Sequence, residues 1–133
     1  MAGTDVRPGR PGGPAGITLP DDTSAVTFLQ KMLQQAVALR ASDLHFEPYE
    51  FNYRVRFRID GELREMASPP LSLKDTLASR IKVISRLDIA EKRVPQDGRI
   101  KLAMGLGQEI DFRVSTLPTL FGEKIVIRVL DPA

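Results

Sequence analysis

RVPQDGRIKLAMGLGQEIDFRVSTLPTLFGEKIVIR, the stretch from Arg93 to Arg128, decides the fold of this chain. Apolar and polar residues alternate through most of it, as they do in strands with one covered face and one wet face. The alternating apolar sets are Ile100, Leu102 and Met104, then Ile110, Phe112 and Val114, then Ile125, Ile127 and Val129. The pattern predicts three strands of a largely antiparallel sheet.

Further alternating segments precede this stretch. Leu44 and Phe46 mark one predicted strand, and the run from Tyr53 to Ile59 marks the next. Asp60-Gly61 and Asp97-Gly98 are dipeptides that favour two-residue hairpin turns, so we expect a turn at each of them. Together these segments predict a mainly antiparallel sheet of five to six strands.

Two other segments repeat apolar residues at every third and fourth position, as amphipathic helices do. Asp22, Thr23 or Ser24 is expected to cap the first helix, and the Ser72 hydroxyl is expected to cap the second, with Asp75 three residues on. The apolar positions are Val26, Leu29, Leu33, Ala36 and Val37, and then Leu73, Leu77, Ile81, Ile84 and Leu87. The apolar face of each helix must be buried against another element, so the sequence predicts an α+β sandwich of two layers with both helices on one face of the sheet.

The composition describes one domain with nearly balanced charge. A chain of 133 residues supplies one core, and 19 basic against 17 acidic residues give a net charge of +2, so nucleic acid is not an expected partner. The absence of cysteine excludes disulfides and thiol catalysis and fits a reducing compartment. No apolar run approaches the roughly 20 residues that span a bilayer. We expect a cytoplasmic protein without direct membrane insertion, which reaches a membrane only through partners.

The first twenty residues differ from the rest. Residues 1–20 hold five of the ten glycines and four of the ten prolines, with few large apolar side chains. Such chain buries too little surface to offset its ordering entropy. We expect residues 1–20 to be a disordered linker or an artificial extension, and residues 21–133 to form the domain.

Few residues suggest chemistry of their own. No GxxxxGK[ST] phosphate-binding loop occurs, and Gly105-Leu106-Gly107 reads as a hairpin loop because it lacks the third glycine and following helix of a dinucleotide fingerprint. His45 shares a strand face with Asp43 and Glu47, but metal sites usually recruit ligands from several elements. We therefore favour a structural hydrogen-bonding role for His45 over a metal site.

The arginines allow more than one interpretation. Arg54, Arg56 and Arg58 alternate with apolar residues, which places them opposite the core, either as a solvated face or as a contact surface for a protein or nucleotide. Arg113 and Arg128 also point away from the core, on strands expected to lie close together. Two arginines that converge from neighbouring strands are able to clamp one anion.

Several segments in order resemble one known family. They read ASDLHFEPY, RVRFRIDG, RIKVISRLDIAEKRVPQDGRI and DFRVSTLPTLFGEKIVIRVLD, and the resemblance covers about Ser24 to Asp131. The chain is similar to the N-terminal half of the ATPase core in type II secretion and type IV pilus assembly ATPases. The wording of RASDLHFEPYEFNYRVRFRIDGELRE and TLPTLFGEKIVIRVLDP looks closer to the pilus extension ATPase.

The resemblance implies a PAS-like domain joined to a RecA-like domain, which is absent from this chain and carries the P-loop, with ATP and magnesium as the cofactors of the full-length parent. It implies a hexameric ring, with the RecA-like domain, neighbouring subunits and an inner-membrane platform protein as partners. Carried over from the family, Arg113 and Arg128 reach the nucleotide phosphates when the domains close. The chain alone is then not an enzyme and holds no cofactor, whereas its parent is an ATPase.

The RVPQDGR loop supplies the remaining candidates. We interpret Arg93, Asp97 and Arg99 as interdomain or intersubunit contacts, with a hairpin turn whose charges stay in water as the alternative. A type II secretion ATPase domain and a free-standing PAS-like ligand-sensing module remain the alternatives for the whole chain. A copurified small molecule would favour the sensing module.

Overall fold

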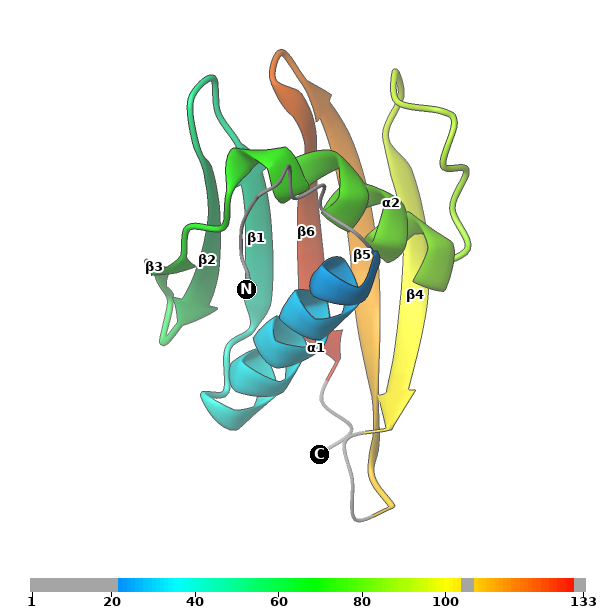
Figure 1. Ribbon diagram of the computed structural model, residues 1–133. Coiled ribbons are helices and arrows are strands. Elements are labelled where there is room, and N and C mark those ends of the chain that lie inside the picture. The colour runs from blue at the N-terminus through cyan, green and yellow to red at the C-terminus, as the bar shows by residue number, and fades with distance from the viewer. Residues whose placement is uncertain (1–21, 104–106, 131–133) are drawn as a thin grey trace, which may run out of the picture.

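The computed structural model describes residues 22–103 and 107–130, and Figure 1 shows their arrangement. In chain order the elements are α1 (Asp22–Ala38), β1 (Asp43–Pro48), β2 (Tyr53–Ile59), β3 (Glu62–Ala67), the 3₁₀ turn η1 (Leu71–Leu73), α2 (Lys74–Ile84), β4 (Gln96–Ala103), β5 (Glu109–Thr119) and β6 (Gly122–Leu130).

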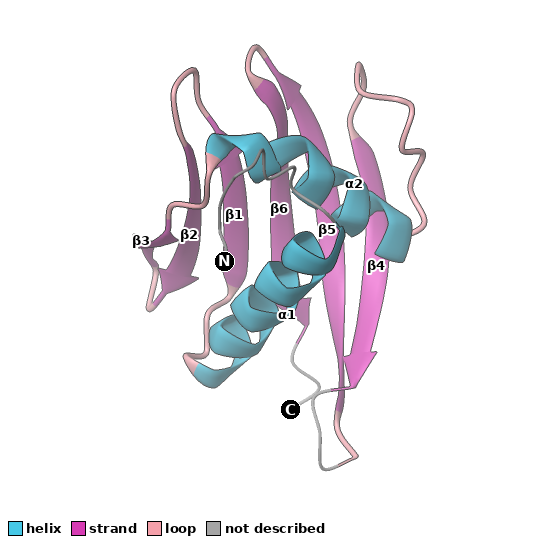
Figure 2. Cartoon of the chain, viewed as in Figure 1, coloured by secondary structure: helices cyan, strands magenta, loops and turns pink. Residues whose placement is uncertain are grey.

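The strands form one six-stranded sheet in the order β3-β2-β1-β6-β5-β4. Every neighbouring pair is antiparallel. Helices α1 and α2 lie on the same face of this sheet, which leaves the opposite face uncovered by any described element (Figures 1 and 2). The expected PAS-like two-layer α+β fold is confirmed.

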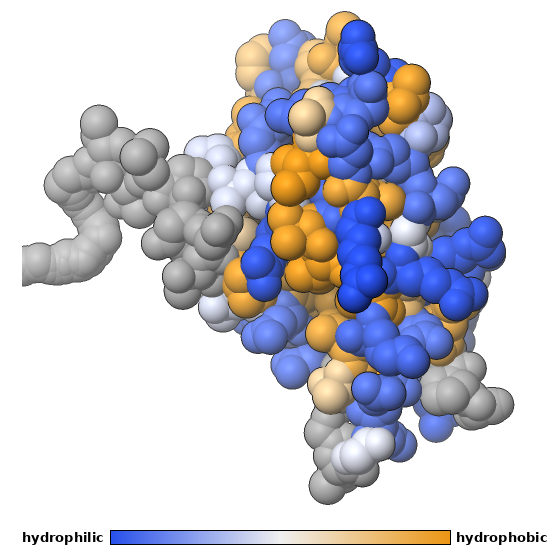
Figure 3. Space-filling view, turned by 90° about the vertical axis from the view of Figure 1, so that its right-hand side faces the viewer, coloured by the Kyte–Doolittle hydropathy of each residue, from blue (hydrophilic) through white to orange (hydrophobic). Residues whose placement is uncertain are grey.

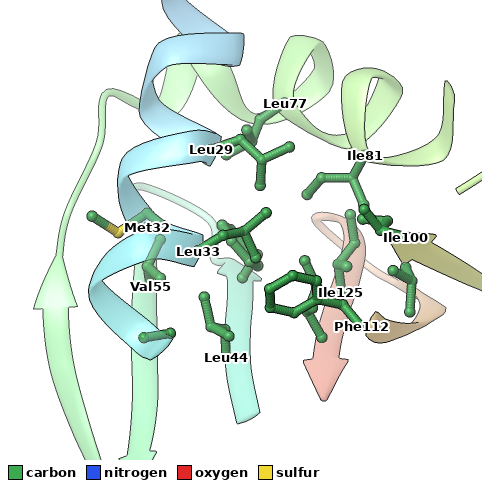
Figure 4. Close-up of a cluster of buried hydrophobic side chains, with 14 of the residues drawn as sticks. Leu29, Met32, Leu33, Leu44, Val55, Leu77, Ile81, Ile100, Phe112 and Ile125 are labelled. Atoms are coloured by element: carbon green, nitrogen blue, oxygen red, sulfur yellow. The ribbon is translucent and has the colours of Figure 1, made fainter. Parts of the chain in front are cut away.

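The core lies between the helices and the covered face of the sheet. In Figure 4, Leu29, Leu33, Leu77 and Ile81 of the helices point toward strand residues such as Phe112. All of these side chains are buried. Burial of an aliphatic or aromatic side chain stabilises a fold by about 1.5–3 kcal/mol, so this layer holds the sheet against the helices and fixes which strand residues face solvent.

The two predicted Asp-Gly turns have different outcomes. Asp60 and Gly61 join β2 to β3 with φ of 52° and 82°, as a two-residue hairpin turn requires. Asp97-Gly98 is no turn but lies inside β4, so that prediction was wrong. A Cβ on Gly98 would stand 2.6 Å from the carbonyl oxygen of Ser85 and 2.9 Å from Leu87 Cδ2. This glycine therefore serves the close approach of the segment after α2 to β4.

The second helix begins differently from the prediction. Ser72 lies within η1, and α2 has no side-chain cap: its N-cap residue is Leu73. The chain enters the helix through a 3₁₀ turn, in which the Leu73 amide donates to the carbonyl of Pro70 at 2.9 Å. The predicted Ser72 cap was wrong because this turn takes its place. Neither described helix is long and apolar enough to cross a membrane.

Candidate functional site

The uncovered face of the sheet carries a row of charged residues, one from each of five neighbouring strands. The strand register places Asp43 of β1 opposite Arg58 of β2 on one side and opposite Arg128 of β6 on the other. Arg128 is in turn opposite Arg113 of β5, and Arg113 is opposite Arg99 of β4. We call Arg99, Arg113 and Arg128 the arginine row.

The arginine row is open to solvent. All three residues are exposed, while their strand neighbours Ile100, Phe112 and Ile127 are buried on the helix side. Within residues 22–103 and 107–130, no hydrogen bond or ion pair reaches any of the three guanidinium groups. The structure thus brings Arg113 and Arg128 side by side, as expected, and adds Arg99 to them.

Asp43 is the carboxylate in the row, but its oxygens are already engaged. Ser42 Oγ donates to Asp43 Oδ1 at 2.6 Å, His45 Nε2 lies 2.5 Å from Oδ2, and Arg58 Nε lies 3.4 Å from Oδ2. Burial by itself raises the pKa of Asp43, but the bonds to Ser42 and His45 and the charge of Arg58 outweigh it, and the pKa falls below 3.8. Asp43 is therefore an ionised group committed to Arg58 and His45, not to Arg128.

Glu47 organises the other arginines of β2. Its side chain is buried and accepts a two-pronged bond from Arg56, with Nε at 2.7 Å and Nη2 at 2.8 Å. Arg54 Nε lies 3.6 Å and Lys124 Nζ 3.5 Å from its oxygens, and the Arg54 guanidinium also stacks 4.8 Å from the Tyr49 ring centre. Burial raises the pKa of Glu47, but bonding and charge from Arg56 and Lys124 lower it overall. Arg54 and Arg56, like Arg58, thus have carboxylate partners, unlike the arginine row.

His45 forms a hydrogen bond within its own strand. It contacts Asp43, while Glu47 is held by Arg56, so the three residues do not converge on one point. His45 Nδ1 is buried without a hydrogen-bond partner among the described residues. In the part of the chain that the structure describes, no three His, Cys, Asp or Glu side chains are grouped to hold a metal.

The RVPQDGR segment divides between a loop and a strand. Arg93 lies in the loop before β4 with its side chain 87% exposed and 3.1 Å from Glu91, whereas Asp97 lies in β4 and accepts a bond from Ser115 Oγ at 2.7 Å. Val94 of this loop is also exposed, at 49%. Figure 3 shows the side of the molecule where β4 and the end of α2 lie. On this side, hydrophobic residues at the surface are flanked by hydrophilic ones.

One buried charge was not anticipated from the sequence. Lys82 of α2 is only 1% exposed; its Nζ lies 2.7 Å from Glu123 Oε2 and donates to the carbonyl of Glu91 at 2.6 Å. A cavity of about 200 Å³ adjoins this pair, lined by α2, the loop after it and the start of β6. Lys82 sits between apolar neighbours of the helix without any pattern that marks it as buried. Its position explains how that loop is fastened to the domain.

Comparison with known proteins assigns the family. A family model described as "Type II/IV secretion system protein" matches residues 18–133. Relatives named type IV pilus assembly ATPase PilB are 63% identical over 86% of this chain in Acinetobacter baylyi and 58% identical over 84% of it in Pseudomonas aeruginosa. A type II secretion system protein E of Dickeya dadantii is 52% identical over 84% of the chain. The chain spans only 20–22% of the length of these relatives.

Solved structures share the fold. The ATPase DotB of Legionella pneumophila superposes with a TM-score of 0.57 at 19% identity, over 90% of this chain and 31% of DotB. The pilus retraction motor PilT with bound ADP gives a TM-score of 0.52 at 18% identity, over 77% of this chain and 29% of PilT. Since the family model covers nearly all of the described residues, the chain belongs to the family of type II/IV secretion system proteins.

Proposed function

We propose that this chain is the arginine-bearing domain of a hexameric ATPase that powers type IV pilus assembly. A RecA-like domain outside these 133 residues binds ATP and magnesium, and this chain moves Arg113 and Arg128 onto the phosphates when the two domains close. The nucleotide supplies the phosphoryl group that is transferred. Because the chain has no P-loop pattern, it does not hydrolyse ATP by itself.

One observation carries this proposal: Arg113 and Arg128 stand directly opposite each other with no carboxylate bound to either within the described residues. Like charges in such positions destabilise a sheet. An arriving anion removes the repulsion, and the planar guanidinium fork matches phosphate oxygens in two-pronged geometry. Positive charge delivered only on closure acts where negative charge develops in phosphoryl transfer.

The pilus machine is favoured over the secretion machine as the system served. The relatives named for pilus assembly share more of the sequence than those named for type II secretion. A type II secretion ATPase domain is the second candidate. Restored pili after expression of the full-length parent in a strain that lacks its own pilus extension ATPase would support the first candidate, and restored secretion without pili would support the second.

The loop before β4 is proposed to contact the RecA-like domain or a neighbouring subunit in the ring. Its support is the combination of exposed charge at Arg93 with exposed apolar surface at Val94 and Ile89, which suits the rim and centre of an interface. In this proposal the hexamer is cytoplasmic and meets the inner membrane through a platform protein.

ATP turnover of the full-length parent tests the role of the two arginines. Arg113→Ala and Arg128→Ala should each lower turnover about tenfold or more, the order seen when a charge contact to the transition state is removed. Arg64→Ala is the matched control, because Arg64 is an exposed arginine that lies opposite the buried Phe57, on the helix face of the sheet and not on the face of the arginine row. Parental turnover by either variant in a correctly assembled hexamer would show that this arginine is only a surface residue.

A further inference from the structure

Arg99 shares the geometry that singles out Arg113 and Arg128. It lies on β4 at the end of the strand order and is the register partner of Arg113, which has Arg128 on its other side. Side chains of directly opposite residues on one face of a sheet are neighbours. Three guanidinium groups from three successive strands therefore line the uncovered face, with Arg113 in the middle.

No carboxylate among the described residues forms an ion pair with this row. Asp97, two residues before Arg99 on the same strand, accepts the hydroxyl of Ser115 at 2.7 Å. Asp43, next in the row after Arg128, is held by Arg58 and His45. Asp111 has Lys101 as its cross-strand partner. The row keeps three positive charges without an ion pair among the described residues.

The length of the row indicates the shape of the anion. Strands lie about 4.8 Å apart, so the backbones that carry Arg99 and Arg128 are separated by two steps, about 10 Å. One phosphate group is fully served by one or two guanidinium forks. A straight row of three suits an extended polyanion with charge along its length better than it suits a single compact anion.

We propose that Arg99 is a third phosphate-contacting residue, and that the arginine row binds the polyphosphate chain of a nucleoside triphosphate lengthwise across β6, β5 and β4. The identity of the anion rests on the proposed function, whereas the three-residue row rests on the strand register. From the sequence, Arg99 was expected to contact another domain or subunit; here it is instead proposed to contact phosphate.

Titration of this chain with tripolyphosphate at low salt tests the proposal without ATP hydrolysis. The Nε–H signals of all three arginines should shift together in nuclear magnetic resonance spectra. Arg99→Gln should weaken binding about three- to fivefold, the range expected for one solvent-exposed charge contact of about 1 kcal/mol or less. Melting curves of the variants verify that each is folded.

Lys101→Gln is the matched control for loss of net charge. Lys101 is exposed on the same strand, two residues from Arg99, but faces Asp111 across the sheet. Weaker binding by Arg99→Gln than by Lys101→Gln supports the inference. Equal weakening by both variants, or none by Arg99→Gln, overturns it.

The same measurements separate the inference from the proposed function. If tripolyphosphate binding requires Arg113 and Arg128 but not Arg99, the inference fails while the proposed function stands. If binding requires all three arginines but the full-length parent keeps its ATP turnover after Arg113→Ala, the proposed function fails and the three-arginine anion site stands.

Discussion

Replacing Arg113 by glutamine should make this chain more stable, although the same residue is proposed to serve catalysis in the parent. Arg113 has two like-charged register partners, Arg99 and Arg128, and no carboxylate partner among the described residues. Glutamine keeps most of the aliphatic stem and removes the charge. Its introduction relieves both repulsions at once.

The magnitude follows from the register. Directly opposite like charges destabilise a sheet by roughly 0.2–1 kcal/mol for each pair, so relief of two pairs stabilises the fold by about 0.5–1.5 kcal/mol. For a domain of this size that corresponds to a rise in melting temperature of about 2–6 °C. Arg99→Gln relieves only one pair and should give about half the gain. Arg128→Gln should give the least, because Arg128 also loses its attractive neighbour Asp43.

Thermal unfolding followed by circular dichroism measures these differences. The gain should be largest at about 0.01 M salt, where the screening length is about 30 Å, and should shrink at about 0.15 M salt, where it is about 8 Å. Arg64→Gln is the control, because its nearest charge is Glu62, at 3.8 Å, and it faces away from the row. The control should change the melting temperature little.

A lower melting temperature for Arg113→Gln at low salt would refute the reasoning. It would mean that Arg113 makes a stabilising contact that outweighs its repulsion by Arg99 and Arg128. A gain that persists unchanged at high salt would also refute it, because relief of repulsion between exposed charges must be screened.

Three further predictions concern the rest of the domain. The folded state lowers the pKa of Glu47 below 4.5, so the stabilisation from ionised Glu47 is present at neutral pH and lost as the pH falls through the folded-state pKa. In urea unfolding from about pH 7 to about pH 3, the free energy of unfolding should therefore fall less steeply with acid in Glu47→Gln than in the parent chain. Gly98→Ala should cost about 1–3 kcal/mol in the same urea assay, because its Cβ would stand 2.6 Å from a carbonyl oxygen, whereas Lys101→Ala on the same strand should cost far less. Lys82→Met alone should lower the free energy of unfolding by about 3–5 kcal/mol, because it leaves Glu123 buried and unpaired. Adding Glu123→Leu should recover most of that loss. No recovery would show that the bond from Lys82 to the carbonyl of Glu91 stabilises the fold more than the ion pair does.

Much of the fold could be predicted because alternation and helical repeats report burial directly. The alternation of Tyr53, Val55 and Phe57 with arginines predicted both the strand and its covered face, and all three apolar side chains are buried in the structure. Strand β3 was harder to predict, because Glu62–Ala67 lies at one end of the sheet order and has no buried residue to mark it. The misplaced turn at Gly98 had a different cause. A glycine that makes room for a distant segment looks the same in sequence as one that makes a turn.

The candidate site could be predicted only in part. Alternation placed Arg113 and Arg128 on the wet face, but which residues stand opposite each other depends on strand register, which sequence alone does not fix. The register places Arg99 opposite Arg113 and Asp43 opposite Arg58. The role proposed for these arginines in the parent stays a prediction.

The arginine row draws each member from a different strand, and this has a consequence for how the site tolerates change. Its spacing is set by the backbone ladder of β4, β5 and β6 and not by the side chains. Slipping one strand by a single residue would turn its arginine toward the helices and bring a buried apolar residue to the surface. Insertions or deletions within these strands should therefore abolish the fold and the site together, whereas length changes confined to the connection between β4 and β5 should leave both intact. The arginine row is in this sense an all-or-none property of correct strand pairing.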